Sequence, residues 1–515
     1  MQTQSEVDWL AALAVPAVIF SLFLALGRAP LFDVDEGAFS QATLEMFQRG
    51  DFLSTYLNGA PRYDKPILVY WLQAIAVALI GPSEWAFRLP SALCATALAW
   101  LTYLFARRHY GAERALFAAL LLATSLGVYV IGRAATADAL LNLLLAAAVF
   151  AAWLHLSSGE RKWLYATHAA IALGLLAKGP IAILIPLAVT GIYCWLRRDL
   201  RTWAKAVFDW RALLLLIAIA APWYAVILVK EGRGFIDGFI LKHNVGRFTG
   251  PVSGHAGSLL YYFPVVVLLT LPFTALLVPV ARSVKTIWRD DLQLYLLIWF
   301  AFVFVFFSLS GTKLPHYLLY GYTGLAILMA VHGFELKGPF WPMVPVLGFF
   351  LALLALPYLV HYGLGHVPDA YYREVLGAAL ERFDTPYFAF LAVLGALVVL
   401  AMLERATPLP RKFAVFGLAA VMSLSTLVVP VLGFAQQGAI KEAAILCREQ
   451  RLDAVLWRLN APSFSVYRGA PTPSREPRPG DVIVTKANRL AELPPGLGYH
   501  QLNSKRGIVL ARIRA

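Results

Sequence analysis

The strongest constraint on the fold is a series of apolar runs, each close to twenty residues long. About twenty residues is the length that an α-helix needs to cross the hydrocarbon core of a bilayer. The chain has 515 residues, of which 60% are hydrophobic and 14% are charged, whereas soluble domains have about 45–50% apolar and about 25% charged residues. These patterns predict a polytopic α-helical membrane protein.

We expect about thirteen transmembrane helices in this chain. They are predicted at residues 9–28, 89–106, 114–132, 138–156, 163–177, 181–196, 211–230, 258–281, 292–310, 315–333, 339–359, 386–404 and 413–432. The run at residues 67–80 is apolar but too short to cross, and it predicts an interfacial helix. If this run does not cross, the short loops rich in Lys and Arg all lie on one side, which the positive-inside rule assigns to the cytoplasm.

This topology divides the chain into two domains. Residues 1–432 form the predicted transmembrane domain, in which residues 30–88 are a large external loop with a further interfacial helix at 37–49. Phe39, Leu44, Met46 and Phe47 give that helix a rough apolar face. Beyond residue 432 the long apolar runs stop, so residues 433–515 predict a small external α/β domain. It would contain a helix at 441–459 and strands at 463–467, 481–485 and 507–510.

Charge and cysteine usage exclude several classes of partner. The net charge is +14, and in a membrane protein such an excess comes from basic cytoplasmic loops beside anionic lipids. We therefore expect membrane lipids as partners and no nucleic acid. Three scattered cysteines do not make a disulfide framework. The sequence also lacks a Gly-rich phosphate cradle, so we expect no nucleotide.

Polar residues that a membrane does not explain gather at the predicted external junctions. Acids at a membrane edge are costly unless they face water, a cation or a substrate. The predicted cytoplasmic junctions carry an excess of bases, whereas the external ones bring acids and bases together around apolar spans, which predicts an external polar cavity. The residues in question are Asp33, Asp35, Glu36, Tyr63, Asp64, Lys65, Asp138, Lys178, His243, Arg247, Lys313, His316 and Tyr317.

Single residues in this set also have ordinary structural interpretations. Asp138 stands where an N-cap would stand, and Lys178 could be a lysine that snorkels at a hairpin tip broken by Gly179-Pro180. Taken together, the cavity suits transfer from a lipid-linked anionic donor. A transporter or lipid flippase and a non-catalytic scaffold are the alternatives. The sequence shows no half-to-half repeat, and its charges lie at one face rather than at mid-membrane, which favours the enzyme.

Several short motifs carry a family resemblance. In chain order they are Asp35-Glu36, Tyr63-Asp64-Lys65-Pro66 with Tyr70-Trp71, Arg88-Leu89-Pro90, and the segments at residues 176–180, 244–248 and 311–317. Their order and spacing over residues 1 to about 430 resemble the polyprenyl-phosphate-dependent glycosyltransferases of GT-C type. The sequence most resembles the bacterial lipid A aminoarabinose-transferase family, which is related to protein O-mannosyltransferases.

The resemblance implies a GT-C fold and an inverting glycosyltransferase of the bacterial inner membrane, with its active site and small C-terminal domain facing the periplasm. The sugar would move from an undecaprenyl-phosphate carrier to lipid A or another envelope glycan, with a protein O-mannosyltransferase-like activity as the alternative. Asp35 and Asp138 are the implied catalytic acids. The residues implied for donor phosphate binding are Lys65, Lys178, Arg247, Lys313 and Tyr317, and we add Asp33, Tyr63 and His316 as supporting residues.

The sequence departs from the family at one place. Asp64 stands where relatives have a glutamate that can bind a metal ion. Aminoarabinose transferases tend to have Glu-Glu-His before an Arg-Phe pair, but here Lys242, His243 and Asn244 precede it. A divalent cation at Asp64 and His243 is therefore a hypothesis, and the identity of the sugar stays open.

Overall fold

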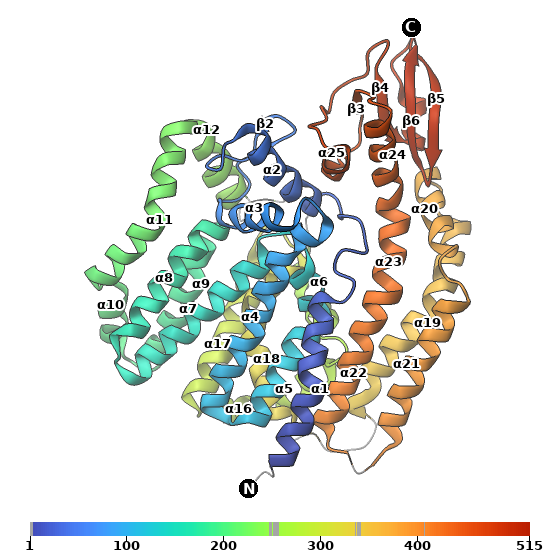
Figure 1. Cartoon of the computed structure of the whole chain (residues 1–515). Helices are drawn as coiled ribbons and strands as arrows, with labels where there is room; N and C mark the ends of the chain where they lie inside the picture. Colours follow the sequence, from blue (N-terminus) through green and yellow to red (C-terminus); the bar gives the residue numbers. More distant parts are fainter. Residues whose placement is uncertain are drawn as a thin grey trace.

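The computed structural model describes residues 4–246, 250, 257–334, 336, 341–405 and 407–514, although not the side chains of residues 4–8 and 245. The first half of the chain is helical apart from a two-stranded hairpin (Figure 1). Its elements are α1 (Gln4–Phe23), α2 (Asp35–Arg49), β1 (Tyr56–Leu57), β2 (Ala60–Pro61), α3 (Leu68–Ile80), α4 (Glu84–Tyr110), α5 (Ala112–Thr124), α6 (Leu126–Arg133), α7 (Asp138–Ser158), α8 (Arg161–Lys178), α9 (Ile181–Leu196), α10 (Leu200–Val207), α11 (Trp210–Glu231), α12 (Arg233–Phe235) and a π-helix at Ile236–Val245.

The second half continues with helices and ends in a small sheet. Its elements are α14 (Tyr262–Leu269), α15 (Leu277–Arg282), α16 (Val284–Ile287), α17 (Asp291–Leu309), a 3₁₀ turn at Pro315–Leu318, α18 (Leu319–Gly333), α19 (Val344–His366), α20 (Ala370–Leu380), α21 (Thr385–Leu403), α22 (Leu409–Ser423), α23 (Val429–Leu432), α24 (Gly438–Glu449), β3 (Ala454–Leu456), α25 (Pro462–Arg468), β4 (Val482–Lys486), β5 (Gly498–Lys505) and β6 (Ile508–Arg514).

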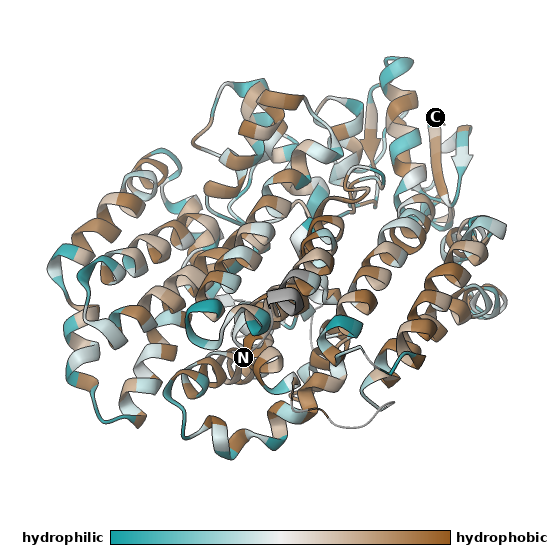
Figure 2. Ribbon diagram, turned by 60° about the horizontal axis from the view of Figure 1, so that its bottom comes forward, coloured by the Kyte–Doolittle hydropathy of each residue, from teal (hydrophilic) through white to brown (hydrophobic). Residues whose placement is uncertain are grey.

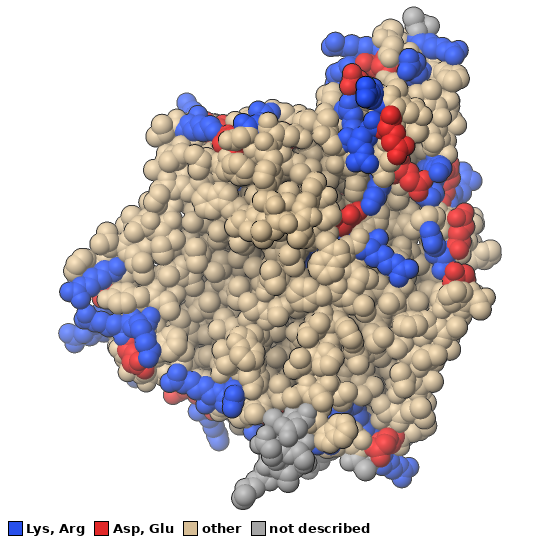
Figure 3. Space-filling model, in the orientation of Figure 1, with Lys and Arg blue, Asp and Glu red and all other residues tan. Residues whose placement is uncertain are grey.

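Every predicted span coincides with a helix or a helix pair, but fewer of them are long and apolar enough to cross a membrane. Within the described residues there are seven such helices, or nine if two bent pairs count as spans. The other runs are shorter, as in α9 and α18, or carry more charge, as in α8 with its three bases. A mostly uncharged belt runs across the molecule between its charged ends (Figure 3), and the helices that form it have brown, apolar faces (Figure 2).

The run predicted at 258–281 is not one continuous span. Helices α14 and α15 are bent by 118°, and Pro272 lies between them, where a proline interrupts the helical hydrogen-bond ladder. The run at 114–132 is also broken, because α5 and α6 meet at 64°. The two breaks touch, since the Leu126 N–H donates to the Leu271 carbonyl at 2.9 Å.

Two helices of the first loop lie across the ends of the long helices (Figure 1). Helix α3 has 13 residues, or about 20 Å, which is short of the roughly 30 Å hydrocarbon core. The helix predicted at 37–49 is α2, and it packs against both α3 and α25. Phe39 and Met46 are buried in a cluster with Ile67 and Tyr70, while Phe47 is exposed.

The C-terminal residues form a four-stranded sheet in the order β3-β4-β6-β5, with a parallel β3-β4 pair and two antiparallel pairs. Helices α22, α23 and α24 are joined by π-helical segments at Leu424–Val428 and Gly433–Gln437. Together they form a 41-residue helix, Leu409–Glu449, which crosses residue 432 and leads into the sheet. The predicted helix at 441–459 ends at Glu449, and β3 follows. The predicted strand at 463–467 is wrong, because this segment is α25. Pro462 fits its first turn, and buried Phe464 faces the same cluster as Tyr467, three residues on.

Candidate active site

The site is assembled from helix ends. Asp35 begins α2, Asp138 begins α7 and Lys178 ends α8. Asp64 and Lys65 lie in the loop before α3, and His243 lies in the π-helix after α12. Helix ends suit this purpose because their backbone and side chains can face a polar cavity while the rest of each helix stays in lipid or protein.

Glu36 is the buried acid of the segment at residues 31–37. Its carboxylate accepts two hydrogen bonds from Arg88, at 2.8 and 2.6 Å, and one each from the backbone N–H groups of Phe32 and Ala135, both at 2.8 Å. Burial opposes ionisation, but the Arg88 guanidinium outweighs it and lowers the pKa of Glu36. Glu36 therefore fastens the start of α2 to α4 and to the loop before α7.

Asp33 connects the segment at residues 31–37 to the C-terminal residues 433–515. Its two carboxylate oxygens accept hydrogen bonds from the Ser463 N–H at 2.9 Å and the Ser463 hydroxyl at 2.5 Å. Burial raises the pKa of Asp33 to about 7. Gly37 permits this approach, because a Cβ there would lie 2.2 Å from Asp33 Oδ1 and 2.4 Å from the Ser463 nitrogen.

Asp35 differs from both neighbours. Its side chain is exposed, and no described residue donates a hydrogen bond to its carboxylate. Arg62 and His316 lie near enough for its charge to act on them. Asp35 is thus an ionisable group held by the first turn of α2, beside a cation and free to meet a ligand.

Arg62 and Asp64 form a second charged cluster. The Arg62 guanidinium lies 3.0 Å from one Asp64 oxygen and donates to the Tyr70 hydroxyl at 3.2 Å. The other Asp64 oxygen lies 2.6 Å from His243 Nε2. Burial would raise the pKa of Asp64, but the His243 hydrogen bond and the charge of Arg62 hold it well below its usual range.

These residues do not make a complete metal site. Among the described residues, no three His, Cys, Asp or Glu side chains come together as metal ligands. The Asp64 oxygens already face Arg62 and His243, and a guanidinium competes with a cation for the same carboxylate. In the described part of the chain, Asp64 and His243 alone therefore do not make up a divalent-ion site.

Asp138 and Lys178 form a buried ion pair. Tyr320 completes it: the Lys178 ammonium donates to the Tyr320 hydroxyl at 2.5 Å, and that hydroxyl donates to Asp138 Oδ1 at 2.6 Å. His316 Nε2 lies 3.5 Å from the same oxygen. The Lys178 ammonium also lies 5.7 Å from the centre of the Tyr317 ring.

A cavity of about 390 Å³ opens beside these groups, and we call it the first cavity. Its polar lining consists of Asp64, Lys65, Lys178, His243, Asn244, Ser310, Tyr317 and Tyr320. Ile181, Leu184, Ile240, Phe306 and Phe307 give it an apolar wall. The arrangement can hold an anion at one end and hydrocarbon at the other.

A second cavity of about 560 Å³ lies beside residues 33 and 34. Asp33 and Val34 line it together with Tyr371 and Tyr372 of α20. Lys486 of β4 also lines it, with its ammonium 4.3 Å from the centre of the Tyr371 ring. Asp35 follows Val34 directly, so it lies beside the second cavity, and its charge also acts on Arg62 and His316.

Lys313 and Tyr63 do not line the first cavity but make hydrogen bonds elsewhere. The Lys313 ammonium donates to the carbonyls of Ser308 and Ser310 at 2.8 and 2.7 Å, where it caps the C-terminal end of α17. The Tyr63 hydroxyl donates to Glu231 at 2.8 Å. Arg247 lies outside the described residues.

The structure also adds residues that sequence reasoning missed. Tyr320 bridges Asp138 and Lys178, and its spacing of three from Tyr317 at the start of a helix was a usable signal, because residues i and i+3 share a face. Ser463 gave no such signal, since 430 residues separate it from Asp33.

Comparisons with known proteins agree with the fold. Residues 64–225 match a family described as dolichyl-phosphate-mannose-protein mannosyltransferase. An uncharacterized protein of Aquifex aeolicus is 33% identical over 324 residues, which is 63% of this chain and 72% of that protein. The undecaprenyl phosphate-α-4-amino-4-deoxy-L-arabinose arabinosyl transferase of Erwinia tasmaniensis is 29% identical over 408 residues, 75% of this chain and 72% of its own length.

The fold is also known from a crystal structure. ArnT from Cupriavidus metallidurans, bound to undecaprenyl phosphate, superposes with a TM-score of 0.80 at 22% sequence identity. The match covers 99% of this chain and 98% of that one. This chain belongs to the GT-C glycosyltransferases that use polyprenyl-phosphate-linked sugars, among the relatives of the aminoarabinose transferases and protein mannosyltransferases.

Proposed function

We propose that this protein is an inverting glycosyltransferase that moves a sugar from an undecaprenyl-phosphate carrier to lipid A on the periplasmic face of the bacterial inner membrane. The observation that carries the proposal is the position of Asp35. It is an exposed carboxylate that follows Val34 of the second cavity, and its charge acts on Arg62 and His316, which contact Asp64 and Asp138 at the first cavity.

The first cavity suits the donor. Lys65 and Lys178 line it and would hold the carrier phosphate, because cations bind phosphate through charge-assisted hydrogen bonds. Asp138 positions Lys178, since its carboxylate and Tyr320 fix the ammonium. The wall that includes Phe306 and Phe307 would contact the first isoprene units of the carrier.

The second cavity suits the acceptor, and Asp35 would act between the two. An acceptor hydroxyl gives its proton to Asp35 as its oxygen attacks the anomeric carbon of the sugar. The bond between that carbon and the carrier phosphate oxygen breaks, and the electron pair leaves with the phosphate. Lys65 and Lys178 stabilise the charge that grows there. A single displacement from the opposite face inverts the anomeric centre.

The sugar and acceptor are proposed from the relatives. Several of them are named for transfer of 4-amino-4-deoxy-L-arabinose from undecaprenyl phosphate, and this is the donor to test first. The periplasmic orientation follows from the basic loops, which lie at the membrane face opposite the candidate site under the positive-inside rule. No step in this proposal passes through a metal ion.

The test is transfer by purified protein in lipid nanodiscs. Undecaprenyl phosphate-linked 4-amino-4-deoxy-L-arabinose and lipid A are supplied, and mass spectrometry detects the modified lipid A. We expect Asp35→Asn to abolish transfer but keep binding of the donor. Asp453→Asn changes a fully exposed acid that pairs with Arg468, and it should leave both unchanged. Transfer by the Asp35→Asn variant would refute the assignment. Transfer to a protein hydroxyl instead of lipid A would favour the mannosyltransferase-like alternative.

A further inference from the structure

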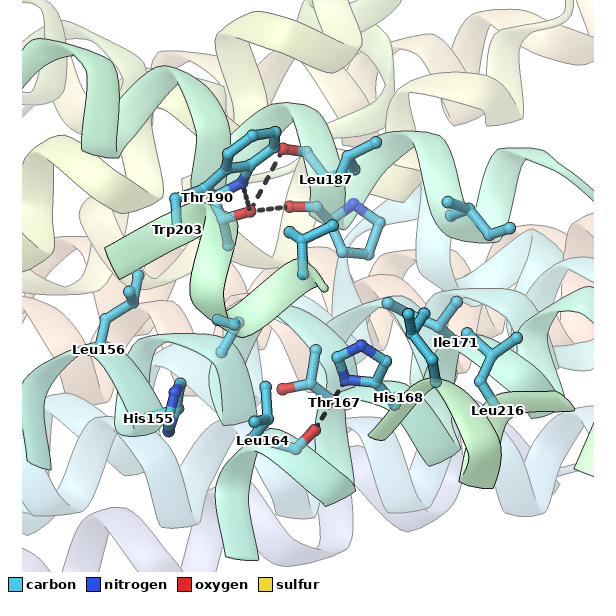
Figure 4. A pocket seen from close by; sticks show the side chains of 16 residues that line it. His155, Leu156, Leu164, Thr167, His168, Ile171, Leu187, Thr190, Trp203 and Leu216 are labelled. Atoms are coloured by element: carbon cyan, nitrogen blue, oxygen red, sulfur yellow. Dashed lines mark hydrogen bonds between the residues drawn. The ribbon is translucent and has the colours of Figure 1, made fainter. Parts of the chain in front are cut away.

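A third cavity lies at the opposite ends of the helices that carry the candidate site. It measures about 230 Å³ and is enclosed by α7, α8, α9, α10 and α11 (Figure 4). Leu164 and His168 of α8 line it, and Lys178 ends the same helix ten residues after His168, or about 15 Å away. We call it the basal cavity.

The polar groups in the wall of the basal cavity are already hydrogen-bonded. The Thr190 hydroxyl accepts from Trp203 Nε1 at 3.1 Å and donates to the Pro186 carbonyl at 2.7 Å. His168 Nδ1 lies 3.0 Å from the Leu164 carbonyl, and the Thr167 hydroxyl donates to the Trp163 carbonyl at 2.9 Å. His155 Nδ1 lies 3.1 Å from the Glu160 carbonyl. The remaining lining is Leu, Ile, Val, Ala and Pro. Such a wall offers hydrocarbon contacts, so it suits an apolar chain.

Cations without acidic partners surround the mouth of the basal cavity. Across the described ranges, no carboxylate lies within ion-pair distance of Arg161, Arg198, Arg201, Lys205 or Arg211. The nearby acids are used elsewhere: Glu160 pairs with Lys162 at 2.5 Å, Asp291 pairs with Arg197 at 2.5 Å, and Asp199 and Asp209 cap α10 and α11. Lys and Arg form a blue cluster at this edge of the molecule (Figure 3).

The exposed residues of α10 and its neighbours indicate where the mouth of the basal cavity lies relative to the lipid headgroups. Trp203, Ala206 and Val207 line the basal cavity, while Arg201 and Lys205 are exposed. The aromatic residues beside α10 are also exposed: Trp195 by 64%, Phe208 by 69% and Trp210 by 67%. Exposed Trp next to Lys and Arg is typical of the headgroup layer, so the mouth lies where acyl chains meet headgroups.

We propose that the basal cavity binds one acyl chain of an anionic glycerophospholipid from the leaflet opposite the candidate site. The lipid phosphate contacts the basic side of α10, and the chain fills the space beneath Trp203. The lipid thereby braces the α8–α9 hairpin, whose tip carries Lys178. Charge complementarity selects the anionic lipid, because the segments around the mouth carry more bases than acids.

The experiment uses the full-length protein and defined lipids. Native mass spectrometry counts phosphatidylglycerol retained after detergent exchange, and thermal unfolding is measured in nanodiscs of phosphatidylglycerol or phosphatidylcholine. Ala206→Trp fills the basal cavity, and the double variant Arg201→Gln, Lys205→Gln removes the charge without changing the core. Ala204→Trp is the matched control, because Ala204 lies on the same helix but does not line the cavity.

The expected result is one retained phosphatidylglycerol and a higher Tm in phosphatidylglycerol than in phosphatidylcholine. Both effects should disappear in Ala206→Trp and in the charge variant but persist in Ala204→Trp. Equal retention of both lipids, retention of detergent only, or unchanged retention by Ala206→Trp would overturn the proposal. If Ala206→Trp fails to fold, the charge variant decides the question alone. The readouts do not depend on sugar transfer.

Discussion

Replacing Lys178 by methionine tests the proposed donor cavity most directly. An ammonium group has three N–H donors, and Lys178 uses two of them on Asp138 and Tyr320. The third is available to a ligand in the first cavity, which Lys178 lines. A hydrogen bond to a charged group contributes about 1.5–3 kcal/mol, and each 1.36 kcal/mol is tenfold in rate. We expect Lys178→Met to lower kcat/KM by about 10- to 150-fold.

The assay is transfer in nanodiscs at varied donor concentration, followed by mass spectrometry of the product. Lys162→Met is the matched control, because Lys162 lies at the other end of α8 and pairs with exposed Glu160. If Asp138 acts only by positioning Lys178, the double variant Asp138→Asn, Lys178→Met loses no more activity than Lys178→Met alone. Independent, additive losses would instead show that Asp138 contacts substrate. An unchanged kcat/KM in Lys178→Met would refute the donor assignment.

Three further predictions concern stability, pH and metal. Glu36→Gln should lower the free energy of unfolding by about 3–5 kcal/mol, seen as a lower Tm, because it leaves the buried Arg88 charge unpaired. Burial raises the pKa of Asp33 from 3.8 to about 7. The contribution of this shift to stability is therefore complete below pH 3.8 and is lost as pH rises through 7. Asp33→Asn should flatten this part of the curve of Tm against pH. Transfer should survive EDTA, because Asp64 is already occupied by cationic or hydrogen-bonding partners; loss of transfer that Zn²⁺ or Mg²⁺ restores would contradict this.

The sequence predicted positions along the chain much better than contacts between helices. The apolar runs located the helices, and the hairpin break at Gly179 is seen in its φ of +92°. The pairing of Asp138 with Lys178 was out of reach, because it depends on how α7 and α8 rotate against each other, and periodicity does not define this rotation. Residues 463–467 show the same limit: a short apolar alternation fits a strand or a helix, and contacts with α24 decide between them.

The three acids at residues 31–37 have different roles: two of them stabilise the fold, and the third is available for chemistry. Glu36 accepts four hydrogen bonds and Asp33 accepts two, so both are part of the packing. Asp35 accepts no hydrogen bond from a described residue, and an acid at a helix N-terminus contributes roughly 0.3–1 kcal/mol. An exposed carboxylate beside Arg62 therefore adds little to stability and is available to a ligand. This reasoning requires that Asp35→Asn keep a Tm close to that of the parent protein; a large fall in Tm would make Asp35 a structural acid.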